Sequence, residues 1–337
     1  MLSHTQSFYP CKDNQTSLGR EHPFLLIKTI ISPALMRRTN TMPRRTFPHL
    51  SALLLVTVAS SVLAAQNDQQ PTDFISLPHG TTNIAVYAAR QSFDGLWNNG
   101  IQAQRVEGST SMTVLRANRH FSVGEEGKYT IAPLIALSAS DTKVNAPSAP
   151  LLAGDTAGFG DLRLGTAFWF YSDHVNREYV MATAIVSLPT GAYIPTQAVN
   201  IGENRTKTVL SLGWMQPLGS AWVLDLVPEI AFFGDNKAYR GNNRLSQDTA
   251  YAMSTTLRYK ATQSMHLYGT AQVNRGGATQ RNGIAMTGAP DNTRLALGTL
   301  LFSTDKSQIQ LRYSKDVQID NGLRNTGEIM LRWSTVF

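Results

Sequence analysis

The chain ends in Glu328-Ile-Met-Leu-Arg-Trp-Ser-Thr-Val-Phe337, a stretch with the period-two alternation of an amphipathic β-strand. Its apolar face consists of Ile329, Leu331, Trp333 and Phe337. Its polar face consists of Glu328, Arg332 and Ser334. In water an unpaired strand of this kind invites aggregation, whereas a closed membrane barrel pairs its last strand with its first. The stretch therefore predicts a strand in the wall of a membrane β-barrel.

Eleven segments upstream show the same alternation, each close to the roughly 9–11 residues that a tilted strand needs to cross a bilayer. With the terminal stretch, the predicted strands are Asn83–Gln91, Thr110–Phe121, Tyr129–Ala139, Phe159–Tyr171, Tyr179–Leu188, Thr206–Met215, Trp222–Phe233, Thr249–Tyr259, Met265–Asn274, Thr293–Phe302, Gln308–Val317 and Gly327–Phe337. We expect an all-β fold, a transmembrane antiparallel up-and-down β-barrel of about 12 strands over residues 81–337.

Short and long connections alternate between these segments. Gly124–Gly127 and Ala261–Ser264 are short, whereas Ser140–Gly158 and Gly234–Asp248 are long. This alternation places every tight turn at one end of the fold and every long loop at the other, as in outer-membrane barrels. A soluble β-sandwich is the competing fold, but sandwiches do not sort their connections by length.

Aromatic residues and one proline add local expectations. Pro228 predicts a β-bulge, because proline cannot donate a ladder hydrogen bond inside a sheet. Aromatic side chains near the predicted strand ends are typical of the girdles at the two membrane interfaces: Phe170, Tyr171, Tyr179, Trp214, Trp222, Tyr251, Tyr259 and Trp333.

The composition fits a barrel and excludes several classes of protein. Only 16% of the residues are charged, below the roughly 25% of an average soluble domain. No run after position 65 approaches about 18 apolar residues, so no transmembrane helix is predicted there. Through Ala65 the chain has seven Lys and Arg against two acids, and from Gln66 onward it has 23 against 21. The net charge of +7 therefore lies mostly in the leader, and nucleic acid is not predicted as a partner.

Residues 42–65 have the pattern of a secretory signal peptide: a basic start at Met42, an apolar run over Ser51–Leu63, and small residues with cleavage expected at Ala64 or Ala65. A membrane anchor is the alternative, but the run is short for a transmembrane span.

Residues 1–41 are interpreted as an over-extended gene start without folded structure. Residues 66–80 are expected to form a periplasmic N-terminal segment or a plug. Cys11, the only cysteine, lies upstream of the expected mature chain, which excludes disulfide and thiolate chemistry there.

Four short motifs follow one another along the chain: Gly158-Phe-Gly-Asp-Leu162, Ser187-Leu-Pro-Thr-Gly191, Gly213–Gly219 and Thr255-Thr-Leu-Arg-Tyr259. In order and spacing they resemble the outer-membrane barrel family known as the MetA-pathway phenol-degradation transporter, within a resemblance over most of residues 75–337. The resemblance implies passage of small hydrophobic or aromatic solutes, and it carries no defining catalytic motif. The ending of the chain also resembles the last strand of bacterial outer-membrane barrels. This implies that Trp333 and Phe337 act as an assembly signal read by the barrel-assembly machinery.

Charged residues on the inward faces are the candidate functional residues, because an ionisable group inside the membrane slab is costly unless it is paired or faces a lumen. A structural ladder of ion pairs and a selectivity constriction of charged rings are both compatible with them. About twelve strands predict a narrow lumen. The inward set is Arg116, Asp161, Arg163, Lys207, Asp225, Glu229, Arg258, Arg312, Glu328 and Arg332.

An enzymatic site is not predicted. His120-Phe-Ser122 loosely resembles the pair of an outer-membrane phospholipase, but residues two apart do not automatically meet as base and nucleophile. The pair also lies beside a predicted short turn, and His120 is expected to form hydrogen bonds at the rim or in the lumen. The histidines are scattered without metal-ligand spacing, so neither a metal nor another cofactor is expected.

These observations predict an outer-membrane channel, exported through a cleaved signal peptide, for passive passage of small hydrophobic or aromatic compounds in either direction. The expected partners are outer-membrane lipid, the barrel-assembly machinery and such solutes, with the oligomeric state left open. The alternative is a barrel without a transport role, either a lipid hydrolase or a protein that binds partners through its outer loops.

Overall fold

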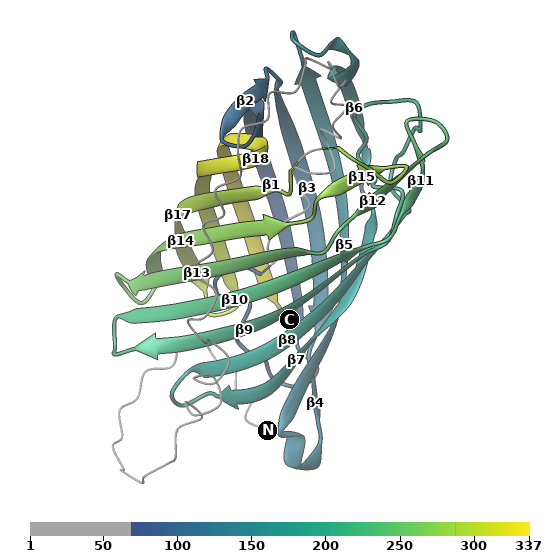
Figure 1. Cartoon of the computed structure of the whole chain (residues 1–337). Coiled ribbons are helices and arrows are strands. Elements are labelled where there is room, and N and C mark those ends of the chain that lie inside the picture. The colour runs from purple at the N-terminus through teal and green to yellow at the C-terminus, as the bar shows by residue number, and fades with distance from the viewer. Residues whose placement is uncertain (1–68, 287) are drawn as a thin grey trace, which may run out of the picture. The chain divides into compact units, whose positions relative to one another are not determined.

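The computed structural model describes residues 69–286 and 288–337, so the expected gene start and signal peptide lie outside the described residues. The described part is a closed antiparallel barrel (Figure 1). The barrel strands are β1 (Thr82–Asn98), β3 (Glu107–Arg119), β5 (Tyr129–Asn145), β7 (Leu162–Asp173), β8 (Glu178–Leu188), β9 (Lys207–Leu218), β10 (Trp222–Phe233), β13 (Ala250–Lys260), β14 (Met265–Gly276), β17 (Asp291–Thr304) and β18 (Ser307–Val336). No helix among the described residues is both long and apolar enough to cross a membrane.

Pairing of β1 with β18 closes the barrel. Asn83 is opposite Val336, and the register continues without a shift to Ser92 opposite Gly327. Backbone hydrogen bonds between Thr82 and Phe337 extend this pairing to the end of the chain. The predicted partnership between the first and last strands is therefore confirmed.

β18 is 30 residues long and makes two passages through the wall. Its first part, from Ser307 to Asn321, pairs with β17, and its second part, from Gly322 onward, pairs with β1. Side chains join the two parts, as between Ser307 and Thr335 at 2.7 Å. The eleven barrel strands thus give twelve passages, and each predicted segment coincides with one of them.

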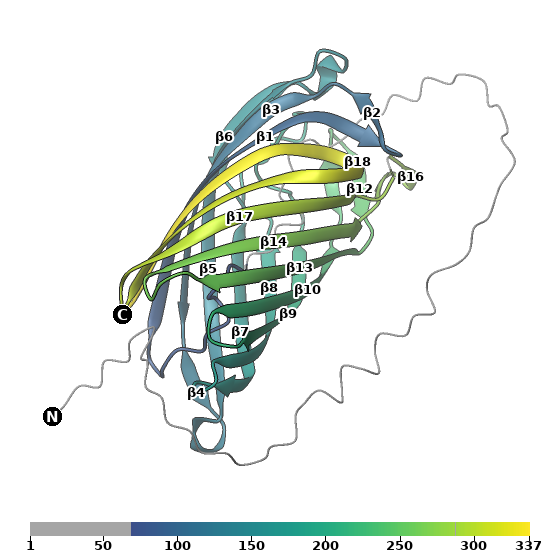
Figure 2. The ribbon, with the colours of Figure 1, turned by 90° about the vertical axis from the view of Figure 1, so that its left-hand side faces the viewer.

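The connections are sorted by length, as predicted. Tight turns, including the 3-10 turn Glu125–Gly127, lie at one end, here called the short-turn end. The opposite, long-loop end carries β2 (Ile101–Gln104), β6 (Gly154–Phe159) and a separate sheet (Figures 1 and 2). That sheet consists of β11 (Asn236–Tyr239), β12 (Asn243–Gln247), β15 (Thr279–Arg281) and β16 (Ile284–Ala285). β4 (Phe121–Val123) lies at the short-turn end beside β5 (Figures 1 and 2).

The two faces of the wall follow the sequence alternation. On β18, Trp333 is 43% exposed while its neighbours Arg332 and Ser334 are buried. Leu164, Phe168 and Phe170 on β7 are likewise exposed on the outer face. The girdle prediction is wrong for Tyr179, which is buried inside the barrel against an apolar cluster.

The bulge predicted at Pro228 is also wrong. Pro228 is opposite Met253 in an unshifted register with β13. On the side of β9 the paired residues stop at Leu226 and resume at Glu229 in the same register. The missing N–H therefore leaves a local gap in the ladder without an added residue.

Gly298 on β17 tests how closely the wall and the inner side chains fit together. A Cβ built on Gly298 would lie 2.4 Å from the ring of Tyr268 and 2.6 Å from the carbonyl oxygen of Leu311. We expect Gly298→Ala to lower the thermal midpoint of barrel unfolding, measured by heat-dependent gel mobility, because overpacking typically costs about 1–3 kcal/mol. Gly269→Ala is the matched control, since its Cβ would meet nothing closer than 3.6 Å. Equal midpoints for the two variants would contradict this packing.

Candidate functional site

Residues 69–78, here called the inner segment, lie inside the barrel, with Leu77 beside His120 at the short-turn end and Gln69 deeper, beside Thr183 of β8 and Ser211 of β9. Its central contact is the carboxylate of Asp73, which bridges two arginines from different wall strands. Arg116 on β3 donates to Asp73 Oδ2 at 2.8 Å, and Arg332 on β18 donates to Oδ1 at 2.6 Å. The Gln70 N–H also donates to Oδ2 at 2.9 Å. Burial alone would raise the pKa of Asp73, but the two guanidinium groups and the Gln70 N–H hold that pKa below its usual range.

The arginines that hold Asp73 also flank an aromatic ring. The guanidinium carbons of Arg116 and Arg332 lie 5.5 Å and 5.4 Å from the centroid of the Tyr87 ring. Cation–π attraction at such distances holds each arginine against the Tyr87 ring, beside Asp73. The inner segment is therefore fixed by an ion-pair cluster that spans β1, β3 and β18.

Amide and hydroxyl groups fix the rest of the segment. Gln69 Nε2 donates to Thr183 at 3.0 Å and to Ser211 at 2.6 Å. The side-chain oxygen Oε1 of Gln70 accepts hydrogen bonds from Gln310 Nε2 and Arg312 Nη1 of β18, at 3.1 Å and 3.2 Å. These contacts tie the segment to opposite parts of the wall.

Thr72 combines strain with anchoring. Its φ of 82° lies in the left-handed region, which is costly for a β-branched residue, by roughly 1–3 kcal/mol. Its hydroxyl exchanges hydrogen bonds with the Gln308 amide at 2.8 Å and 3.1 Å. The wall thus holds the segment in a conformation that its backbone does not favour.

Phe74 packs the segment into an apolar cluster inside the barrel. Its ring is 2% exposed, and its carbonyl oxygen accepts a hydrogen bond from Trp169 Nε1 at 2.6 Å. A Cβ on Gly213 would lie 2.6 Å from the Phe74 ring, so glycine at that wall position leaves room for Phe74. The cluster is Phe74, Ala132, Ala167, Trp169, Tyr179, Met181, Met215, Val223 and Val227.

His120 supports the segment from the short-turn end and is not paired with Ser122. The Leu77 N–H donates to His120 Nδ1 at 3.2 Å, and Nε2 lies 2.9 Å from the Asn118 amide. The ring stacks on Trp169 with centroids 4.9 Å apart. Burial lowers the pKa of His120 to about 4, so the neutral imidazole accepts the Leu77 hydrogen bond. The predicted hydrogen-bonding role of His120 therefore agrees with the structure.

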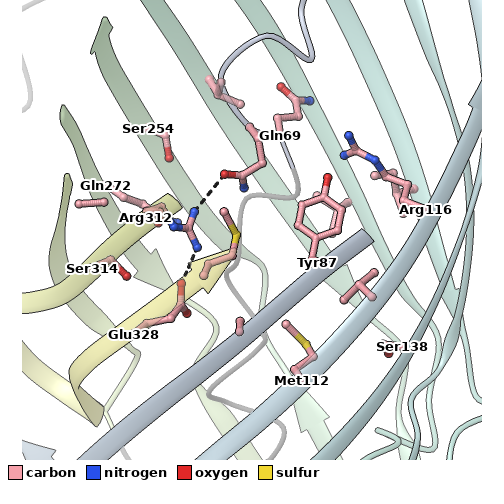
Figure 3. A pocket seen from close by; sticks show the side chains of 18 of the residues that line it. Gln69, Tyr87, Met112, Arg116, Ser138, Ser254, Gln272, Arg312, Ser314 and Glu328 are labelled. Atoms are coloured by element: carbon pink, nitrogen blue, oxygen red, sulfur yellow. Dashed lines mark hydrogen bonds and ion pairs between the residues drawn. The ribbon is translucent and has the colours of Figure 1, made fainter. Parts of the chain in front are cut away.

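Next to the inner segment the lumen contains a cavity of about 180 Å³ (Figure 3). Gln69, Gln70, Pro71 and Phe74 form part of its lining. Seven of the ten predicted inward residues line it as well: Arg116, Asp161, Arg163, Lys207, Asp225, Arg312 and Glu328.

The remaining predicted residues have other positions. Arg258 and Arg332 are each 1% exposed and lie outside the cavity lining, in ion pairs with Asp225 and Asp73. Glu229 is half-buried on β10 and does not line the cavity. The predicted set thus contains residues that line the cavity and residues that lie outside its lining, and their role in selectivity stays a prediction.

Two predicted acids have clear structural contacts. Asp225 accepts from Arg258 Nε at 2.9 Å and Nη2 at 3.1 Å, a bidentate buried pair. Asp161 accepts from the N–H groups of Gly191 and Glu203 at 2.8 Å and 2.9 Å, which holds the connection between β8 and β9. Asp161 therefore fixes a long-loop connection at the edge of the cavity.

Sequence reasoning missed Asp73 itself, as well as Gln70, Gln310 and Ser314. One signal was available: the ten predicted inward residues comprise six basic residues and four acids, so additional acid was needed to balance the charge of the interior. Asp73 supplies that acid from outside the wall strands.

Trp333 and Phe337 lie on the outer face, 43% and 70% exposed, and their role in assembly stays a prediction.

No cluster of three or more His, Cys, Asp or Glu side chains able to hold a metal is found within the part of the chain that the structure describes.

The closed barrel, its apolar outer face and its polar interior define an outer-membrane β-barrel protein. The chain belongs to the family described as putative MetA-pathway of phenol degradation, whose model matches residues 78–333. The family resemblance of the sequence motifs is confirmed by this match. None of the curated proteins matches the chain significantly.

Among solved structures, the chain is similar to the COG4313 outer membrane channel from Pseudomonas putida F1. The TM-score is 0.75 at 27% identity, over 80% of this chain and 100% of that one. Lower similarity is found to the β domain of the Bordetella autotransporter BrkA, with a TM-score of 0.48, 12% identity, and 77% and 100% coverage. For the P. putida toluene transporter TodX the values are 0.40, 13%, and 77% and 91%.

The buried Asp225–Arg258 pair predicts that removing one of its two charges strongly lowers the free energy of unfolding of the barrel. Asp225→Ala removes the carboxylate that forms the bidentate pair with the buried Arg258, so we expect a loss of about 3–5 kcal/mol in the free energy of unfolding, measured by urea titration in detergent micelles. Replacing both residues by Leu is expected to restore most of that loss. Glu107→Ala, in the exposed pair with Arg105, should change stability by less than about 1 kcal/mol. Similar losses in Asp225→Ala and Glu107→Ala would contradict the burial of the inner pair.

The buried neutral His120 predicts a loss of stability in mild acid. Its folded pKa of about 4 lies below the unfolded value of 6.5, so the unfolded chain binds the proton more readily. The contribution is present above pH 6.5 and declines as the pH falls toward 4, reaching about 2 kcal/mol of loss at pH 5. Urea midpoints measured at pH 8 and pH 5 should differ more for the native chain than for His120→Gln. An equal pH dependence in both would refute this assignment.

Proposed function

We propose that the protein is a passive channel of the outer membrane for small hydrophobic or aromatic solutes, and that the inner segment is its plug. The observation that carries this proposal is the position of Asp73. It lies inside the lumen, between Arg116 and Arg332, and the segment around it forms part of the lining of the lumen cavity.

The lumen and the relatives support transport over a purely structural barrel. A barrel of about eight strands is filled by its own side chains, whereas the described barrel leaves a cavity beside the inner segment. The similar COG4313 protein is a channel, and the family description refers to phenol degradation. Passage in either direction is compatible with a passive pore.

The inner segment is built for reversible release. Its contacts with the wall are mainly hydrogen bonds and ion pairs, which water can replace, and Phe74 supplies one apolar anchor. The backbone strain of the left-handed Thr72 is released when the segment leaves the lumen. The segment therefore acts as a gate whose closed state is the one described. The short-turn end, where Leu77 of the segment contacts His120, is assigned to the periplasm, where outer-membrane barrels place their short turns.

A lipid hydrolase, the competing function, is disfavoured by the contacts of His120. Both ring nitrogens lie within hydrogen-bond distance of groups other than Ser122, and the ring is buried against Trp169. A general base must reach its nucleophile, and this imidazole instead supports the inner segment. The protein is accordingly proposed to have no enzymatic activity.

The proposed plug is tested by a substitution that weakens its attachment to the barrel wall. Asp73→Ala removes the group that both arginines hold, so we expect the open fraction of single channels in planar bilayers to rise at least about tenfold, the effect of roughly 1.4 kcal/mol. The matched control is Asp94→Ala, which removes an acid paired with Arg324 on β18, outside the inner segment. It should leave the open fraction unchanged.

An equal open fraction in Asp73→Ala and the native chain would contradict the plug. The transport role itself is tested in cells: loss of the gene should slow growth on an aromatic carbon source, and unchanged growth would contradict uptake of such compounds.

A further inference from the structure

The chain between the inner segment and β1 is held by one wall residue, His120, which lies between β3 and β4. Its backbone bonds the residues next to β1: the Gly80 N–H donates to the His120 carbonyl oxygen, and the His120 N–H donates to the Thr81 carbonyl oxygen, each at 2.8 Å. Its imidazole reaches further back and accepts from the Leu77 N–H at Nδ1, at 3.2 Å. The imidazole is therefore the group through which His120 holds the inner segment itself.

This contact requires an imidazole without a proton on Nδ1. A backbone N–H can only donate, and a protonated imidazole carries an N–H on both of its nitrogens. Protonation of His120 therefore turns the bond to Leu77 into two N–H groups that face each other. The ring has little room to turn aside, because it is 2% exposed and stacks on Trp169 with centroids 4.9 Å apart.

The charges around His120 come from the inner segment and the wall. Asp73 of the inner segment favours the protonated ring, whereas burial opposes it. Arg116 of β3 and Arg332 of β18 pair with that carboxylate, and Trp169 of β7 brings no charge. Because these arginines keep the pKa of Asp73 below its usual range, Asp73 stays ionised at pH 5. Mild acid therefore acts on the imidazole and leaves the ion pairs of Asp73 in place.

A second imidazole near this point has a weaker hold. His79 Nδ1 accepts from the Ser122 N–H at 3.1 Å, and its ring lies edge-on to Phe121. The guanidinium of Arg119 on β3 lies over the same Phe121 ring. His79 is exposed, so water can replace its bond to Ser122. The buried His120 is therefore the residue whose protonation costs a contact that water does not restore.

We propose that protonation of His120 releases the inner segment, so that the channel opens in mild acid. This inference rests on the proposed plug and adds its regulation. A charged imidazole is stabilised by water, which it reaches when Leu77 and the rest of the segment move away. Displacement of the ring also disturbs Trp169, whose Nε1 donates to the carbonyl oxygen of Phe74, the apolar anchor of the segment.

The pH range follows from the two states of the ring. In the closed state burial holds the pKa of His120 at about 4, whereas the ordinary value of a histidine is 6.5. The open state, in which the ring is hydrated, therefore binds the proton more readily. The closed state keeps its full advantage above pH 6.5 and loses it as the pH falls toward 4. For full hydration of the ring, the open-to-closed ratio rises about 30-fold by pH 5.

Single-channel recordings of the full chain in planar bilayers test this device. We expect the open fraction of the native protein to be at least about tenfold higher at pH 5 than at pH 8. In His120→Asn the amide oxygen takes the place of Nδ1 and accepts from Leu77 at either pH, so the open fraction should not depend on pH. His266→Asn is the matched control, since His266 is also buried, at 1% exposure, but lies on β14 against Phe302. It should keep the native pH dependence.

An equal open fraction of the native protein at pH 5 and pH 8 would overturn the inference, whatever the variants do. Native pH dependence in His120→Asn, or its loss in His266→Asn, would overturn it as well. Asp73→Ala is expected to open the channel at pH 8 without any proton uptake. Opening in Asp73→Ala with a native channel that ignores pH would therefore remove this inference alone, whereas no opening in either experiment would contradict the plug itself.

Discussion

The wall of this barrel must satisfy its own backbone hydrogen bonds, because lipid offers no partner for an N–H or a carbonyl group. Pairing of β1 with β18 meets that constraint, and the interior follows from it. Once the wall is closed, alternate side chains must face the lumen, which brings Arg116 and Arg332 close enough to share Asp73. The same alternation places Trp333 toward lipid and Arg332 inward on neighbouring positions.

Charge balance then organises the interior. A buried arginine is tolerated only with a partner, and the wall strands provide Asp225 for Arg258 and Glu328 for Arg312. Arg116 and Arg332 instead receive their acid from the inner segment. Holding that segment in place is therefore linked to the stability of the barrel interior. In the described arrangement both Arg116 and Arg332 have an acidic partner.

The wall was predictable from sequence because a period of two and the alternation of connection lengths are local signals. Even β18 was predicted as two passages, from its two alternating halves. The interior contacts were less accessible. Nothing local to Asp73 indicates that it meets Arg332, which is 259 positions away, and the inward aromatic ring of Tyr179 carries the same pattern as a girdle residue. The position of the inner segment depends on three-dimensional fit, as between Phe74 and Gly213.

The central claim is that the inner segment closes the lumen. Its most direct test joins the segment to the wall: Gln69→Cys and Ser211→Cys, whose native side chains are in contact at 2.6 Å, are linked by a short reducible bifunctional thiol reagent in a chain with Cys11→Ser. Linked protein in planar bilayers should show no channel openings, and reduction of the linker should restore them. Equal conductance before and after reduction would contradict the claim.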